Sequence, residues 1–108
     1  MQTKPKILTQ LKIIETLYHQ GNINQTIEQT LDKIISQELA IAQQKKAELE
    51  SDLKQFETQY QLISPEFYQR FHQGQLGDDI DFVEWNAFYE MLKSLQKQIE
   101  LLQSQNNS

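Results

Sequence analysis

Phe71-His72-Gln73-Gly74-Gln75-Leu76-Gly77-Asp78-Asp79-Ile80-Asp81-Phe82-Val83-Glu84-Trp85 lies between two segments that have the periodicity of helices. This stretch contains two of the three glycines in the chain, three of its five aspartates and its only tryptophan. Glycine adopts positive φ at little steric cost, so closely spaced glycines favour a turn. We therefore expect residues 74–80 to form an acidic, glycine-containing loop that reverses the direction of the chain.

Two helices are predicted before this loop. The first covers residues 5–20 and ends at Gly21, the usual position for glycine just past a helix end. The second covers residues 25–63, has Asn24 as its cap and contains no glycine or proline. Apolar residues in this second helix alternate in steps of four and three, which is the period of a coiled coil. The predicted coiled-coil seam comprises Ile35, Leu39, Ala42, Leu49, Leu53, Phe56 and Tyr60.

The second helix would be roughly 57 Å long at ~1.5 Å per residue. That length exceeds a compact domain of this size, so part of the helix must meet another helix or another subunit. We therefore expect a dimer that buries the remaining apolar surface. Lys46 lies on the seam. Two interpretations remain open: a snorkelling lysine at the edge of the stripe, or a polar position that sets the register of a dimer.

Two further helices are predicted around the loop. Ser64 is the expected cap of a short helix over residues 65–73, with Pro65 in its first turn. Asp81 is the expected cap of a helix over residues 81–104, with Glu84 completing a capping box. The apolar residues of this last helix repeat with the same period as the seam: Trp85, Phe88, Leu92, Leu95, Ile99 and Leu102. The two seams can pack antiparallel.

These patterns predict one all-α domain over residues 1–108, an elongated helical hairpin around a long spine helix with coiled-coil packing. The chain has no cysteine, no apolar run long enough to span a membrane and no recognisable signal peptide. A cytoplasmic protein that does not contact membranes is therefore expected. The net charge of −5 is uneven, with +2 over residues 1–46 and −7 over residues 47–108.

The acidic stretch resembles the end of a calcium-binding loop only superficially. With Ile80 at position 8 and Glu84 at position 12, the ligand positions 1, 3 and 5 fall on Gln73, Gln75 and Gly77. Two glutamines and a glycine do not replace the oxygen ligands that calcium requires there. The chain also lacks a nucleophile elbow, a phosphate-binding glycine loop and clustered histidines. We expect no catalytic residue, no metal site and no cofactor, and hence a protein that is not an enzyme.

Two features of the stretch leave a choice between structure and binding. The aspartates either cap a helix or form an acidic knob that contacts a partner, and the aromatic residues either form a core or remain partly exposed as a binding patch. The residues that we predict to bind a partner are Phe71, Leu76, Asp78, Asp79, Phe82, Trp85 and Tyr89. A separate possibility is a small DNA-binding regulator that uses the helix, turn and helix of residues 5–35.

The segments Phe67-Tyr68-Gln69-Arg70-Phe71 and Gly74-Gln75-Leu76-Gly77-Asp78-Asp79-Ile80-Asp81-Phe82-Val83-Glu84-Trp85 resemble the pattern of small prokaryotic antitoxin-like proteins. Those proteins are encoded beside a toxin-like companion in a two-gene toxin–antitoxin module. The similarity covers roughly residues 64–95, under a third of the chain. It implies a non-enzymatic protein that binds and neutralises a partner toxin. The alternatives from the residues alone are a structural coiled-coil adaptor that mediates oligomerisation and the DNA-binding regulator.

Overall fold

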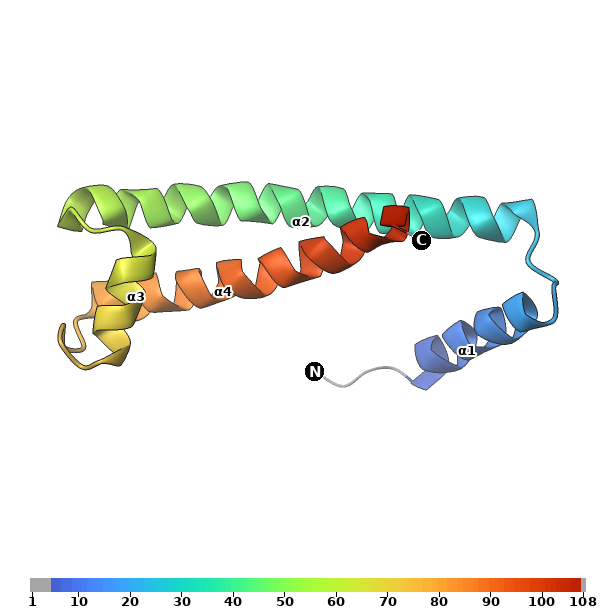
Figure 1. The fold of residues 1–108 in the computed structure, drawn as a ribbon, viewed down its shortest axis with the longest axis horizontal. Coiled ribbons are helices and arrows are strands. Elements are labelled where there is room, and N and C mark those ends of the chain that lie inside the picture. Colours follow the sequence, from blue (N-terminus) through green and yellow to red (C-terminus); the bar gives the residue numbers. More distant parts are fainter. Residues whose placement is uncertain (1–4, 108) are drawn as a thin grey trace. The chain divides into compact units, whose positions relative to one another are not determined.

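A computed structural model describes residues 5–107 and shows only helices within that range. The helices are α1 (Pro5–His19), α2 (Gln25–Tyr60), α3 (Ser64–His72) and α4 (Ile80–Gln103), followed by the 3₁₀ helix η1 (Ser104–Asn107). The all-α prediction is therefore confirmed (Figure 1). No helix among these residues is both long enough and apolar enough to cross a membrane.

The chain divides into two compact units, Met1–Ile35 and Ser36–Ser108. The sequence predicted a single domain, because nothing in its pattern marks a boundary between Ile35 and Ser36. The helix α2 continues across this boundary without a break. The two units are described separately below.

The first unit contains α1 and the beginning of α2, joined by a short turn. Gly21 has a φ of 75°, as expected for a glycine just past a helix end. The backbone N–H of Ile27 donates a hydrogen bond of 2.9 Å to the Asn24 side-chain oxygen, so the predicted cap of α2 is confirmed. None of the described side chains in this unit is buried.

The second unit is an antiparallel hairpin made by α4 and the part of α2 that follows Ile35 (Figure 1). The short helix α3 lies across the end at which the chain turns from α2 to α4, here termed the closed end. The core combines side chains from all three helices: Ala42, Leu49, Leu53, Phe67, Trp85, Leu92, Leu95 and Ile99. The predicted packing of two helical seams is confirmed by this core.

The seam of α2 is covered by α4 of the same chain. Ala42, Leu49 and Leu53 are buried, and the neighbouring seam residues Leu39, Phe56 and Tyr60 are partly buried against the same core. Ile35, which begins the predicted seam, lies in the first unit and is partly buried. Lys46 is also half-buried, where it lines a groove with Ile99 and polar neighbours. Its position fits an aliphatic stem lying along apolar surface.

The helix α2 ends at Tyr60, three residues before the predicted end at residue 63. Gln61 has a φ of 54°, which removes it from the right-handed helical region and stops the helix. Ile63 then becomes the residue before α3, with extended backbone angles, and its side chain is 59% exposed. The early stop follows from this left-handed conformation, which the apolar periodicity does not encode.

Candidate functional site

The loop between α3 and α4 covers residues 73–79, one residue earlier than the predicted 74–80. Gly74 and Gly77 have φ values of 74° and 79°, which a residue with a Cβ adopts only at a cost. The two glycines let the chain leave α3 after His72 and enter α4 at Ile80. The conformation of this loop brings α3 against α4 at the closed end of the hairpin (Figure 1).

The cap of α4 is Asp79 and not the predicted Asp81. The Asp79 side chain accepts a hydrogen bond of 2.9 Å from the backbone N–H of Asp81. Asp81 instead accepts a hydrogen bond of 2.5 Å from the Tyr60 hydroxyl. This hydrogen bond is the main reason that the pKa of Tyr60 is raised to about 12, with burial and the negative charges of Asp81 and Asp79 acting in the same direction. The predicted capping box is wrong because Tyr60 engages the carboxylate of Asp81.

Ser64 does not cap α3 either. The residue that precedes α3 is Ile63, and the backbone N–H of Ser64 donates a hydrogen bond of 2.7 Å to Glu57 Oε2. A carboxylate from α2 thus satisfies the first turn of α3, where negative charge is favoured. The Ser64 hydroxyl is buried and accepts a hydrogen bond of 2.9 Å from the indole N–H of Trp85. Ser64 is therefore a core residue.

Trp85 lies at the centre of an aromatic stack. Its ring is parallel to Phe67 at a centroid distance of 3.8 Å and to Phe56 at 5.5 Å. Tyr60 adds a further stacked contact at 5.8 Å. Both Trp85 and Phe67 are fully inaccessible to solvent. A partner cannot contact Trp85 in this structure, so its contribution to any binding surface is to hold that surface in place.

The other residues predicted to bind a partner divide into two groups. Phe71, Leu76, Phe82 and Tyr89 are partly buried and pack against the hydrophobic core. Asp78 and Asp79 are exposed, although the carboxylate of Asp79 already serves as a helix cap. The aromatic residues are thus mainly core, and of the predicted residues Asp78 is the one that is both exposed and uncommitted.

Two exposed apolar residues that the sequence prediction missed lie beside Asp78. Ile80 is 80% exposed and Val83 is 50% exposed, although both belong to α4. Glu84, next to Val83, is also exposed. On a helical wheel Ile80 and Val83 fall on the face opposite Trp85, a signal that could have revealed them. We call the surface formed by Asp78, Ile80, Val83 and Glu84 the acidic–apolar tip.

A polar aromatic cluster joins α3 to α4 on the surface. The Tyr68 hydroxyl donates a hydrogen bond of 3.2 Å to Glu90, and the Lys93 ammonium lies 4.8 Å from the centre of the Tyr68 ring. Burial is the largest cause that raises the pKa of Tyr68, and the nearby Glu90 carboxylate adds to it. His72 lies 2.9 Å from the Asn86 side-chain oxygen. These contacts hold α3 in place against α4.

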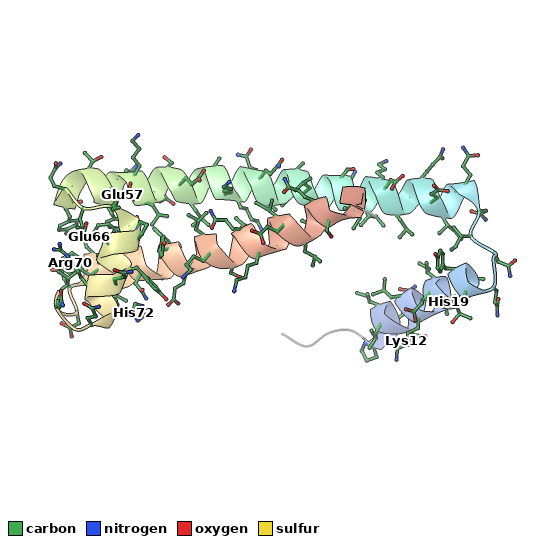
Figure 2. The ribbon with its side chains drawn as sticks, in the orientation of Figure 1. Lys12, His19, Glu57, Glu66, Arg70 and His72 are labelled. Atoms are coloured by element: carbon green, nitrogen blue, oxygen red, sulfur yellow. The ribbon has the colours of Figure 1, made fainter. Side chains whose placement is uncertain are left out.

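Figure 2 shows Glu66, Arg70 and His72 along α3, with Glu57 on the neighbouring end of α2. Arg70 and Glu66 form an ion pair of 2.6 Å one helical turn apart, and both side chains are about half exposed. Exposed pairs of this kind contribute little to stability. No group of three or more histidine, aspartate or glutamate side chains among residues 5–107 is arranged to hold a metal ion.

The second unit has several grooves that are open to solvent. One has a volume of about 400 Å³ and is lined by residues of α2, α3 and α4, among them Glu57, Ser64 and Tyr89. Its serine is already committed to Trp85, and its glutamate to the first turn of α3. The groove therefore offers neither a free nucleophile nor a free general base from these two residues.

Comparisons with models of known protein families, with curated proteins and with solved structures found no match for this chain.

Proposed function

We propose that this chain is a non-enzymatic protein-binding module that contacts its partner through the acidic–apolar tip. The observation that carries the proposal is the 80% exposure of Ile80 in the first turn of a well-packed helix. Val83 lies one turn further along the same face and is half exposed. Apolar side chains surrounded by charges are typical of the centre and rim of a protein interface.

The charges beside the tip indicate what kind of partner would fit. Asp79 and Asp81 are engaged within the chain, whereas Asp78 and Glu84 have no hydrogen bond or ion pair within residues 5–107. Residues 36–108 carry six basic and twelve acidic side chains, a net charge of −6. A basic partner surface with an apolar pocket for Ile80 would complement both features.

The partner that we propose is a toxin protein encoded next to this chain, which the chain would neutralise by covering its surface. The support is the resemblance of residues 64–95 to antitoxin-like proteins, together with the exposed tip inside that segment. Neutralisation by masking needs a complementary surface and no catalytic group.

The two alternative functions have less support. A coiled-coil adaptor would use the α2 seam between subunits, yet Ala42, Leu49 and Leu53 are buried within the chain. A DNA-binding regulator would use residues 5–35, which contain three lysines and three acidic residues. A net charge of zero provides no overall attraction for phosphates.

The proposal is tested by co-purifying the chain with the product of the neighbouring gene and measuring the complex by calorimetry. The variants Ile80→Ala and Val83→Ala should each weaken binding about tenfold, because each removes an apolar anchor. Ile63→Ala is the matched control, since Ile63 is 59% exposed in the same unit but lies outside the tip. Unchanged affinity in both tip variants would refute the proposed surface. A neighbouring product that does not bind would refute the toxin as partner.

A further inference from the structure

The first unit has apolar residues, but its described part, residues 5–35, forms no core. Among residues 5–35 no side chain is buried, and seven of the large apolar ones are clearly exposed: Ile7, Leu8, Leu11, Ile13, Tyr18, Leu31 and Ile34. A unit of this size cannot bury enough surface to be stable by itself. The apolar side chains of this unit therefore need a further surface to cover them.

The apolar face of α1 is too wide for one neighbouring helix. At ~100° per residue, its apolar side chains extend over roughly 220° of the helix circumference, whereas a helix with one packed face needs a stripe of about 100°. The residues in this arc are Ile7, Leu8, Leu11, Ile13, Ile14, Leu17 and Tyr18, interrupted by Lys6, Gln10 and Glu15. The arc provides one face for α2 and a second face for another helix.

An open groove marks where the other helix would lie. Its walls come from both helices of the first unit and are mainly apolar: Ile7, Gln10, Leu11, Ile13 and Ile14 of α1, and Leu31 and Ile34 of α2. The volume of the groove is about 440 Å³, and it is open to solvent. It is therefore a shallow apolar surface suited to the side chains of a helix.

We propose that this groove is occupied by the first unit of a second copy of the same chain, so that residues 5–35 of two copies form a four-helix bundle. The charge of the unit supports a second copy as the occupant. Residues 1–35 have a net charge of +1, so two copies meet with almost no repulsion, whereas residues 36–108 carry −6. Two amphipathic helices from each of two chains are also sufficient to enclose a common core.

The self-association surface proposed here differs from the predicted coiled-coil seam. The seam residues of α2 that follow Ile35 are covered by α4 of the same chain, so they offer little surface to another subunit. The first unit has the opposite character: no side chain of residues 5–35 is buried, and the net charge of residues 1–35 is near zero. Self-association through residues 5–35 is independent of the proposed toxin-binding tip, which belongs to α4 and the preceding loop.

Sedimentation equilibrium of the full chain tests the proposal. The expected mass is about twice the 12.8 kDa of one chain at micromolar concentration. Ile7→Glu should raise the dimer dissociation constant about 100-fold or more, because a symmetric interface buries the new charge twice. Ile41→Glu is the matched control: Ile7 and Ile41 are both 49% exposed, and Ile41 lies outside the first unit. This control should leave the dissociation constant unchanged.

Hydrogen exchange of the unmodified chain provides a second test that does not depend on the folding of a variant. Amide protection of residues 5–35 should increase with protein concentration, while protection of residues 36–103 should not. Mass action favours a dimer at high protein concentration. A monomeric mass at about 100 μM would therefore overturn the proposal. It would also be overturned by a dimer that Ile41→Glu disrupts and Ile7→Glu does not, or by protection of residues 5–35 that is independent of concentration.

Discussion

The hydrogen bond between Trp85 and Ser64 allows a quantitative prediction of how much the packing at the closed end contributes to stability. The indole N–H donates to the Ser64 hydroxyl at 2.9 Å, and the two residues are 0% and 2% exposed. Ser64→Ala removes the acceptor and leaves a buried N–H without a partner. Such a group costs about 1–3 kcal/mol, and we expect the free energy of unfolding to fall by that amount.

The assay is urea unfolding followed by circular dichroism and by fluorescence of Trp85, the only tryptophan. With a urea m-value of about 1.5 kcal/mol/M, the unfolding midpoint should fall by about 0.7–2 M. Ser94→Ala is the matched control, because Ser94 is exposed in the middle of α4. Alanine is the better helix former, so this control should gain up to about 0.5 kcal/mol.

A double-mutant cycle separates the hydrogen bond from other effects of the serine. Trp85→Phe removes the donor, so Ser64→Ala in that background should destabilise the protein by about 1 kcal/mol less than it does alone. Circular dichroism follows unfolding in these variants, which lack the fluorophore. The role of this hydrogen bond would be refuted if Ser64→Ala lowered the free energy of unfolding equally in the unmodified chain and in the Trp85→Phe variant. It would also be refuted if the urea midpoint of Ser64→Ala were no lower than that of Ser94→Ala.

Two other predictions concern the end of α2. The raised pKa of Tyr60 means that the folded state favours the protonated hydroxyl, so its contribution to stability is complete below pH 10 and is lost as the pH rises toward about 12. Tyr60→Phe should therefore reduce the loss of stability between pH 10 and 12, which is measured from urea midpoints across that range. If the variant and the unmodified chain lost stability equally over this range, Tyr60 would not be the responsible group. Gln61→Gly should stabilise the protein by about 0.5–1 kcal/mol, because Gln61 adopts a φ of 54° that glycine tolerates better. Gln55→Gly, at an exposed position in the interior of α2, should instead destabilise the protein by about 1 kcal/mol in the same unfolding assay. The same sign for both substitutions would contradict the argument.

Periodicity and turn chemistry predict much of this fold because they depend on neighbours in the sequence. The spacing of apolar residues identified the two seams, and glycine at positions 21, 74 and 77 indicated the turns. The Asn24 cap is also local, because its side-chain oxygen accepts a hydrogen bond from Ile27, only three residues further on. Each of these signals is local, so the sequence contains it in readable form.

Contacts between elements were not predictable in the same way. Asp79 and Asp81 are equally suitable caps by residue type, and the choice between them depends on Tyr60, which lies 21 residues before Asp81. The same separation joins Ser64 to Trp85, and Glu57 reaches Ser64 across the end of α2. These partners are determined by how α3 packs on the hairpin. The division into two units was also hidden, because α2 spans it as a continuous helix.

The residues predicted to bind a partner agree only in part with the residues that are exposed on the candidate surface. The pattern pointed to the loop before α4, where Asp78 is exposed. It favoured the aromatic residues, yet Trp85 is in the core and the exposed apolar residues are Ile80 and Val83. Aromatic residues are large enough to contribute either to a core or to an interface, and only their exposure distinguishes the two.

The aromatic stack at the closed end has a consequence for the rate and order of folding. The contact between Ser64 and Trp85 closes a chain segment of 21 residues, whereas contacts at the open end, such as the groove shared by Lys46 and Ile99, close much longer segments. Loop-closure entropy increases with segment length, so we expect the aromatic stack to form first and the two helices to pair outward from it. Substitutions near Trp85 should therefore slow folding, and substitutions near Ile99 should mainly accelerate unfolding. We therefore expect the segment that reverses the chain to be also the segment where the hairpin starts to fold.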